Sequence, residues 1–504
     1  MVVAPPRRKV LLVEFNEITW RIIRPLVAQG KLPTFARFLA EGTVASPVAT
    51  EVPPHLDPWI SWMSVYTGRP REEHGVHFLE QPPETVHGPK VHDLAAEGGR
   101  SVGVFGSIMT WPPRKDIRGF WVPSTFSPDT QTFPEDLEPI QQLNLSQTRA
   151  HTPLAKGTKL VRQAGLVARL IKLGLKPSTL ARLAAALAKF KLQPHRVWEK
   201  VSLQPIINFD FFERLYRQHR PDFATFHSNH AAHYMHRYWR SHDPSAFLTK
   251  PSDEEIRQKG DAITFGYQVA DELLAKIERL VGPNTVIMVA SGLGQQPYVD
   301  ERFPEGRNVL RIRDINQLID LIGMTGRCRS LSIMAPQWIL SFPDPADLDT
   351  AESRLRQAWI ERPDIPLFAV DRQGDTLCLN LTQRAFEDYD PNRRCVFPHQ
   401  PEREHRLEDL AIASDPTRKE GWHDPVGVLL VKGPGIKSGV DLGECSNLDL
   451  APTMLYLLNL PIPEHMKGRV LMDAFEADLA DEVAPAGVPA VSDALAAPVV
   501  ASGV

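Results

Sequence analysis

Cysteine is scarce in this 504-residue sequence: there are four, all widely spaced. Their spacing excludes a CxxC metal or redox pair, and we expect reduced, mostly buried thiols of the kind found in cytosolic proteins. No run of about 18 apolar residues is present, so no transmembrane helix is expected. The first residues also lack the long apolar region of a signal peptide. We therefore expect a cytoplasmic protein, with a peripheral position at the membrane as a further possibility.

Acidic residues are nearly absent from one segment, residues 151–200. It holds eleven Lys and Arg against one acid, a net charge of +10 that leaves −14 for the rest of a chain whose total is −4. Leu, Val and Ala at helical spacing run between the cations, as in helices that lie at a membrane interface. The segment predicts either peripheral membrane contact or a solvated lid. Nucleic acid is not expected as a partner, because aromatic residues for base stacking are scarce there.

Five apolar, β-rich runs indicate buried strands, and they begin at Lys9, Ser101, Asp222, Thr285 and Gly427. Such near-continuous apolar runs are typical of a parallel sheet that is covered on both faces. Amphipathic helical patterns lie between them. The alternation predicts an α/β fold with a doubly wound, mainly parallel sheet, in which ligands bind beyond the carboxyl ends of the strands.

The chain divides into four expected parts. The α/β core comprises residues 1–130 and 216–478, with a smaller insertion near residues 300–420. Residues 131–215 form a helical basic insertion or lid. Residues 479–504 are rich in Ala, Pro and Val without aromatic anchors, and this composition predicts a disordered tail.

Polar side chains follow the first predicted strand, where VEFNEITW places Glu14, Asn16 and Glu17 near the carboxyl edge of the sheet. Paired carboxylates there can bind a metal or move protons. The alternative is that they are solvated loop acids that favour the start of the next helix.

Asp57 is a second candidate, in the stretch HLDPWISW. It can cap a helix that begins at Pro58, since Asp is favoured at the N-cap and Pro at the first helical position. A functional role is the alternative, with Trp59 as a neighbouring substrate contact.

Histidines recur every third residue in FHSNHAAHYMHRYWR, at His227, His230, His233 and His236. Imidazoles at i and i+3 on a helix can share a ligand, but helix rotation lets at most two or three of the four converge. His423, in EGWHDP, lies just before a strand at the predicted mouth of the sheet. It is either a site residue or simply half-buried.

Several stretches resemble the alkaline phosphatase superfamily, in particular its type I phosphodiesterase/nucleotide pyrophosphatase branch. They are VLLVEFNEITWRIIRPLVAQGKLPTFARFLAEG, YTGRPREEHGV, HDPVGVLLVKGPGI and SNLDLAPTMLYLLNLPIPEHMKGRVL, and they cover roughly residues 9–110 and 205–474 in the family's order. The resemblance implies an α/β fold, two metal ions, usually zinc, and a Thr or Ser nucleophile that attacks a phosphoric or related ester.

Most of the family's site residues are missing at the matching positions. Its first aspartate falls on Asn16, its nucleophile on Pro58, and its Asp-His-Gly loop on the residues 292–294, which are Gly, Leu and Gly. Neutral amide and aliphatic side chains are poor zinc ligands. A standard two-zinc centre is therefore not expected.

The family's Asp-x-x-x-His pair also lacks its aspartate. The pair falls on Ala232 and His236, or in another register on Asn229 and His233, and only His423 matches a family metal ligand cleanly. A single divalent metal remains possible. Its expected ligands are Glu14, Asn16, His236 and His423, with His233 as the alternative to His236.

Three functions follow from this set of residues. The first is a hydrolase or transferase that acts on a phosphorylated or other anionic ester, from a small molecule to a glycan-linked or lipid-linked one. Asp57 and Glu17 are then the expected catalytic residues, and Asn229, Ser291 and Trp59 contact the substrate. The alternatives are a pseudoenzyme that binds a phosphorylated ligand or partner, and a membrane-surface or polyanion-binding protein.

Overall fold

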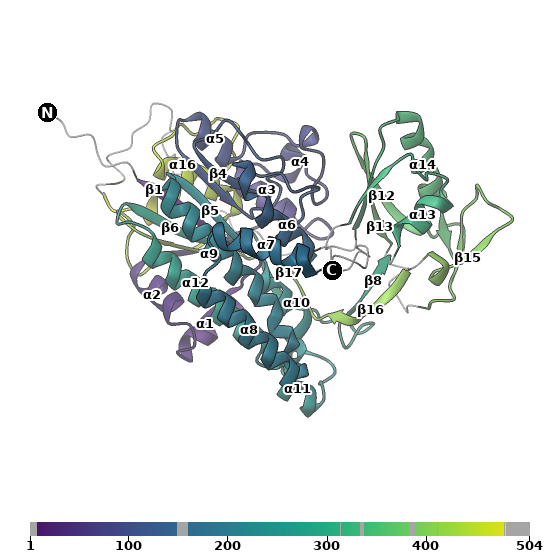
Figure 1. The fold of residues 1–504 in the computed structure, drawn as a ribbon, viewed down its shortest axis with the longest axis horizontal. Helices are drawn as coiled ribbons and strands as arrows, with labels where there is room; N and C mark the ends of the chain where they lie inside the picture. The colour runs from purple at the N-terminus through teal and green to yellow at the C-terminus, as the bar shows by residue number, and fades with distance from the viewer. Residues whose placement is uncertain are drawn as a thin grey trace, which may run out of the picture.

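A computed structural model describes residues 8–148, 160–312, 314–332, 337–382, 390–410, 412–477 and residue 479 (Figure 1). The tail predicted to be disordered lies outside the described residues apart from Leu479. The first nine residues of the basic segment, 151–159, also lie outside them.

The core of the molecule is one eight-stranded sheet with the order β19-β2-β18-β6-β1-β5-β3-β4. All five predicted strands belong to it. The bounds are β1 (Lys9–Phe15), β2 (Thr43–Val48), β3 (Val102–Phe105), β4 (Gly119–Val122), β5 (Phe223–Ser228), β6 (Thr285–Ser291), β18 (Val428–Lys432) and β19 (Val440–Ser446). Strands β1, β3, β4, β5 and β6 pair in parallel, as do β2 and β19. Only β18 runs antiparallel to its neighbours β6 and β2, so the predicted doubly wound, mainly parallel α/β fold is confirmed.

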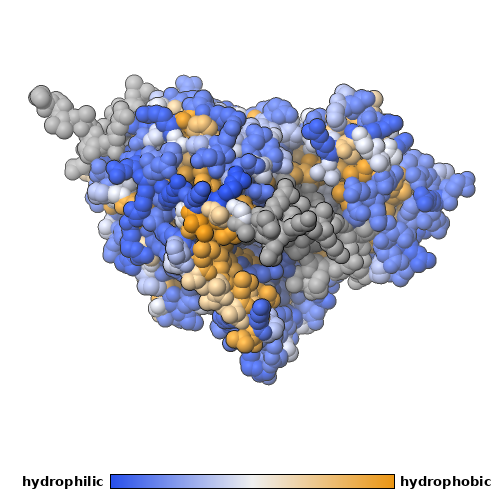
Figure 2. Space-filling view, viewed as in Figure 1, coloured by the Kyte–Doolittle hydropathy of each residue, from blue (hydrophilic) through white to orange (hydrophobic). Residues whose placement is uncertain are grey.

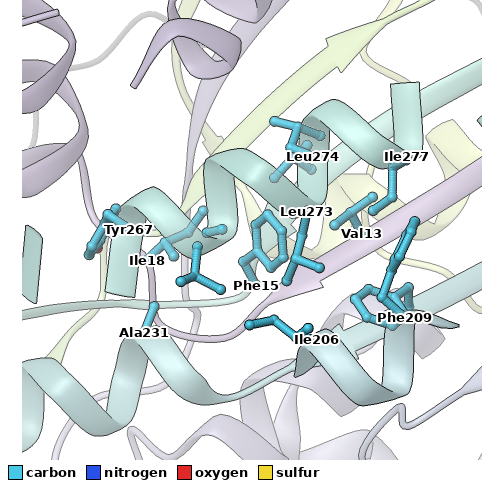
Figure 3. Packing of buried hydrophobic residues seen from close by; sticks show 14 of the residues in the cluster. Val13, Phe15, Ile18, Ile206, Phe209, Ala231, Tyr267, Leu273, Leu274 and Ile277 are labelled. Atoms are coloured by element: carbon cyan, nitrogen blue, oxygen red, sulfur yellow. The ribbon is translucent and has the colours of Figure 1, made fainter. Parts of the chain in front are cut away.

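Helices cover both faces of the sheet because each strand is apolar on both sides. On one face Leu11, Val13 and Phe15 of β1 pack against α9 and α12, and on the other Val10 and Leu12 pack against α3, α5 and α16. Figure 3 shows the first of these layers, with Val13 and Phe15 close to Ile206, Phe209, Leu273, Leu274 and Ile277.

The helices of the core begin and end close to their sequence signals, since α1 ends just before Gly30 and α2 ends before Gly42. Their bounds are α1 (Trp20–Ala28), α2 (Pro33–Glu41), α3 (Pro58–Thr67), α4 (Arg71–His74), α5 (Val91–Glu97), α6 (Glu138–Thr148), α7 (Leu160–Lys172), α8 (Pro177–Leu192), α9 (Leu203–His219), α10 (His230–His242), α11 (Asp253–Lys259), α12 (Ala262–Leu280) and α16 (Leu450–Leu457). A 3-10 helix, η4 (Pro194–Ser202), joins α8 to α9.

A second lobe with its own hydrophobic cluster lies beside the core (Figure 1). It contains the sheets β12-β13-β10-β9 and β11-β14-β15. Its elements are β9 (Arg329–Ser332), β10 (Gln337–Ser341), β11 (Trp359–Ile360), β12 (Phe368–Gln373), β13 (Thr376–Leu381), β14 (Arg394–Val396), β15 (Glu404–Arg406), α13 (Ile315–Leu321) and α14 (Pro345–Gln357).

Two antiparallel ribbons connect the lobe to the carboxyl end of the main sheet. Strand β8 (Arg307–Ile312) pairs with β16 (Ile412–Lys419), and β7 (Gly294–Pro297) pairs with β17 (Gly421–Asp424). The second ribbon places His423 opposite Gln295. Among the helices described, none is both long enough and apolar enough to cross a bilayer.

Candidate metal centre

Three side chains from distant parts of the chain converge where β1 ends: Glu17, His236 and His423. The His236 Nε2 atom lies 3.0 Å from the Glu17 Oε2 atom, and His423 Nε2 lies 3.7 Å from the same oxygen. One ligand atom from each residue lies within 4.8 Å of the other two. Glu17 follows β1, His236 lies on α10, which follows the neighbouring β5, and His423 lies on β17. The parallel pairing of β1 and β5 brings Glu17 and His236 to one edge of the sheet, and the β7–β17 ribbon adds His423.

Backbone carbonyls fix which nitrogen of each imidazole faces the carboxylate. His236 Nδ1 lies 2.9 Å from the Gly421 carbonyl oxygen, and His423 Nδ1 lies 2.6 Å from that of Leu56. A carbonyl oxygen only accepts, so each Nδ1 must donate its hydrogen. The Nε2 atom of each imidazole is then the nitrogen that faces the Glu17 carboxylate.

The two Nε2 atoms and the Glu17 carboxylate leave a place that suits a metal cation. Burial lowers the pKa of His423 to about 4 despite the attraction of Glu17, so this imidazole is neutral near pH 7. Metal-bound histidines commonly donate their other ring N–H to a backbone carbonyl, which orients the ring and fixes the tautomer. Two imidazoles and one carboxylate form a donor set that suits zinc and other divalent transition metals.

Glu17 is held in place from two sides. Its Oε1 accepts from Asn16 Nδ2 at 3.0 Å, and its Oε2 accepts from Gln295 Nε2, whose amide also donates to the Ala232 carbonyl at 3.2 Å. The backbone of Glu17 has φ 60°, in the left-handed region, which turns the side chain toward the cluster. Burial raises the pKa of Glu17, but positive charge at the His236 and His423 positions, with hydrogen bonds from His236 and Gln295, lowers it to about 2. A metal cation between the three groups acts in the same direction. The carboxylate is therefore charged at neutral pH.

Asn16 lies beside the cluster and is engaged by protein partners. Its amide donates to Asn229 Oδ1 at 2.7 Å, and its Oδ1 accepts from Trp62 Nε1 at 2.8 Å. The predicted ligand oxygen is thus occupied by an indole N–H. The structure joins Asn16, Asn229 and Glu17 in one hydrogen-bonded chain.

Asp57 stands at the N-cap position of α3, but its side chain makes no capping hydrogen bond. Instead its Oδ1 lies 3.6 Å from His423 Nδ1, and its side chain is 27% exposed. Burial raises the pKa of the Asp57 carboxyl to about 7, with Lys419 opposing the shift and Glu17 adding to it. Asp57 is therefore an ionisable group beside the cluster that reaches solvent.

Cations from the lobe ribbon stand close to these acids. Burial lowers the pKa of Lys419, although Glu17 and Asp57 raise it. Lys419 pairs across the ribbon with Arg307, and both cations lie over the Trp422 ring, at 5.2 and 5.1 Å from its centroid. Lys419 and Arg307 thus give the approach to the cluster a positive potential that attracts anions.

Other predicted site residues lie apart from the three-residue cluster. Glu14 is fully buried and contacts His227 Nδ1 at 3.0 Å and Ser107 Oγ at 3.0 Å. Ser291 donates to the Leu293 carbonyl at 2.5 Å, within its own turn. Trp59 Nε1 donates weakly to a backbone carbonyl in the loop after α4, at 3.4 Å.

The alternative ligand His233 is absent from the cluster; its ring lies against Tyr234, with centroids 6.1 Å apart. Sequence reasoning missed two residues of the site, Gln295 and Lys419. Both lie on ribbons whose pairing is not visible in local sequence, although Gln295 follows the SGLG turn at a conspicuous strand end.

The turn at residues 292–294, which the sequence matched to the family's Asp-His-Gly loop, is closely packed. Leu293 is buried against Ala49 and Leu56. Gly292 packs so closely on Ser61 that an added Cβ would lie 3.2 Å from the Ser61 Cβ and carbonyl oxygen. Ser61 itself is fully buried. These residues offer apolar contacts in place of ligands.

Comparisons with known proteins give matches that are either short or low in sequence identity. No family model matches the chain. Curated 2,3-bisphosphoglycerate-independent phosphoglycerate mutases from strains of Cereibacter sphaeroides are 51% identical over 51 residues, which is 10% of this chain and 10% of the mutase. The chain thus spans about a tenth of the length of the curated relatives it matches.

Solved structures with similarity include two forms of ectonucleotide pyrophosphatase/phosphodiesterase 5. The murine protein, in an inactive form in complex with AMP, has 11% sequence identity and a TM-score of 0.41 over 93% of this chain and 100% of that chain. The human protein has 12% identity, the same TM-score and the same coverage.

Proposed function

We propose that this chain is a divergent member of the alkaline phosphatase superfamily that hydrolyses or transfers a phosphorylated or other anionic ester with one bound divalent cation. Glu17, His236 and His423 hold the cation. We propose one cation and not two, because Gly292 and Leu293, which match the family's Asp-His-Gly loop in sequence, have no side chain that could bind a second metal.

The observation that carries the proposal is the geometry of the cluster: the Nδ1 atoms of His236 and His423 donate to backbone carbonyls, and both Nε2 atoms face one buried carboxylate, at 3.0 and 3.7 Å. A buried carboxylate and two imidazole nitrogens this close together are stabilised by positive charge between them, and a divalent cation supplies that charge. A divalent cation bound there supplies Lewis acidity toward a phosphoryl oxygen.

The chain's own residues supply substrate attraction and proton transfer. Lys419 and Arg307 draw an anionic ester to the cluster and oppose its charge. Asp57 Oδ1, at the amino end of α3 and 3.6 Å from His423, accepts a proton from an attacking water or hydroxyl group. A positioned general base of this kind contributes about 10²- to 10⁴-fold to the rate.

Binding without turnover is the second candidate function. It is favoured by the loss of the family's nucleophile: Pro58 stands at that position, Ser61 is buried, and Ser64 is engaged with Glu51 at 2.7 Å and His74 at 3.2 Å. In that case the bound cation and the Lys419 ammonium hold a phosphorylated ligand at the cluster without turnover.

Turnover of bis(p-nitrophenyl) phosphate and p-nitrophenyl phosphate separates the two. We expect slow turnover with added zinc or manganese, its loss on chelation, and a loss of at least about 100-fold in Asp57→Asn. Asp344→Asn is the matched control, because Asp344 is an N-cap aspartate of the second lobe, on α14, and should keep full activity. Equal activity in Asp57→Asn and the parent would contradict the role of Asp57. No turnover with any divalent metal would favour binding alone.

A further inference from the structure

Helices α7 and α8 expose large apolar side chains to solvent. Val167 and Ile171 on α7 are 41% and 47% exposed, and Leu187 and Leu192 on α8 are 61% and 83% exposed. Hydrophobic residues form a band over this part of the surface (Figure 2). On α8 the band is extended by exposed alanines at 181, 184, 185 and 188. Such a patch is unusual on a protein surface that meets only water.

The exposed apolar residues are not needed to attach the helices to the core. The opposite sides of α7 and α8 already do so: Leu170 and Leu175 are buried in the core cluster, and Leu180 and Leu183 pack against it. Helix α8 also contacts α9 and η4. Helices α7 and α8 are apolar on both sides, but only the inward side of each is buried against the core. The outward side is therefore available to bind a partner.

The charges around this apolar face divide into two groups. Three cations are neutralised by core acids: Lys176 lies 2.5 Å from Glu213, Arg182 lies 2.8 Å from Glu272 and Lys189 lies 2.7 Å from Glu199. They hold the helices to the core. The basic segment's excess charge must therefore reside in its other cations.

The remaining cations adjoin the exposed apolar residues. Arg169 and Lys172 flank Ile171, Lys191 precedes Leu192, and Lys200 follows on η4; all four are exposed. In the part of the chain that the structure describes, no ion-pair partner is found for them. Neither α7 nor α8 contains Asp or Glu. The surface thus combines exposed apolar side chains with cations that have no ion-pair partner among the described residues.

We infer that the outward face of α7 and α8 docks on an anionic lipid surface. Charge complementarity selects this partner, because unpaired cations beside exposed Leu, Ile and Val match anionic headgroups above an acyl layer. A second copy of this chain would bring like charges together across the contact. The docking is peripheral and reversible, and it leaves the cluster at Glu17 free, since none of the contacts of that cluster comes from α7 or α8.

Vesicle flotation of the full-length protein tests this inference. Vesicles of phosphatidylcholine with about one third phosphatidylserine should float the protein at low salt, and pure phosphatidylcholine vesicles should not. Raising the salt to 0.5 M should weaken the binding. Binding to both vesicle types alike, or to neither, would overturn the inference.

Two variants separate the charge from the apolar contribution. Lys172→Ser with Lys191→Ser should weaken partitioning to anionic vesicles about 30-fold, since each cation contributes roughly a fivefold factor. Ile171→Ser with Leu187→Ser and Leu192→Ser should weaken it at least about tenfold without loss of fold, because these side chains are exposed. The matched controls are Lys31→Ser with Lys250→Ser, and Leu248→Ser with Val299→Ser, which change exposed residues elsewhere.

The controls should bind like the parent. If the α7–α8 variants also bind like the parent, the face is not the docking surface. If the apolar variant instead converts a dimer into a monomer in sedimentation velocity while vesicle binding is absent, a second copy covers the face and the lipid inference is wrong.

Discussion

Replacing Asn16 by aspartate puts a second negative charge into the buried cluster. Asn16 is 3% exposed, and its amide nitrogen lies 3.0 Å from Glu17 Oε1 and 2.7 Å from Asn229 Oδ1. In Asn16→Asp both donated hydrogen bonds are lost, and a carboxylate oxygen takes the place of the amide nitrogen. Glu17 is ionised, since its pKa is about 2. Two like charges about 3 Å apart then repel by about 5.5 kcal/mol at an effective dielectric constant of 20.

Protonation and small movements relieve part of this repulsion. We expect Asn16→Asp to lower the free energy of unfolding by about 3–5 kcal/mol in the presence of chelator, as for other buried uncompensated charges. Asn16→Ala removes the hydrogen bonds without adding charge and should cost only about 1–3 kcal/mol. The difference between the two variants isolates the electrostatic part.

Added zinc should reverse the effect, because a dication offsets the extra carboxylate. Urea unfolding of the parent, Asn16→Asp and Asn16→Ala, each with chelator and with saturating zinc, gives the comparison. The reasoning is refuted if Asn16→Asp is as stable as Asn16→Ala in chelator, since Glu17 would then not be a buried, ionised carboxylate beside that position.

Three further predictions concern separate residues. His92 lies among Tyr66, Trp121 and Phe223, and burial lowers its pKa to about 3. Because this folded pKa is below the unfolded value of about 6.5, the unfolded chain takes up the proton first as the pH falls, and stability present above pH 6.5 is lost toward pH 3. His92→Phe should therefore remove about 2 kcal/mol of the stability difference between pH 7.5 and pH 5, measured by urea unfolding; an unchanged difference would contradict the neutral, buried state of His92. Gly292→Asp should lower stability by about 1–3 kcal/mol without adding a metal equivalent, because its side chain collides with Ser61; a gain of a second zinc in metal analysis would show that the site can be rebuilt. Lys419→Met should raise the KM for an anionic ester about tenfold. The control Arg418→Met, which changes a neighbouring exposed cation, should leave the KM unchanged. Equal KM values for both variants would show that Lys419 does not contribute to substrate binding.

The main sheet could be predicted from the sequence because its strands are short, apolar on both faces and separated by amphipathic helices. Local patterns of this kind are set by burial alone. The antiparallel direction of β18 could not be predicted, because its apolar run reads the same in either direction. The parallel pairing of β2 with β19 was also not predictable, because it depends on the path of the chain between distant strands.

The candidate centre could be predicted in part. The sequence indicated His236 and His423 as metal ligands and Glu17 as a catalytic residue, and the structure brings these three together. The other two expected ligands, Glu14 and Asn16, are engaged elsewhere. The sequence did not indicate that Glu17 would join the two histidines through its left-handed backbone and the Gln295 contact. The Gln295 contact depends on the β7–β17 ribbon, whose two strands are far apart in the sequence.

The opposite outcome is seen at Glu14. It stands only three residues from Glu17 and was an equal candidate in the sequence. Yet the alternation of side chains along β1 turns Glu14 to the other contacts, with Ser107 and His227. Glu14 therefore forms a buried contact with His227, whereas Glu17, beyond the turn that follows Phe15, joins the metal centre.

Metal content per chain tests the central claim most directly. Purified protein, dialysed against zinc and then against buffer, should retain one equivalent by elemental analysis. Glu17→Gln and His423→Ala should each lose it, whereas Glu14→Gln should keep it. Two equivalents in the parent, or one equivalent that survives in both Glu17→Gln and His423→Ala, would contradict a single cation held by Glu17, His236 and His423.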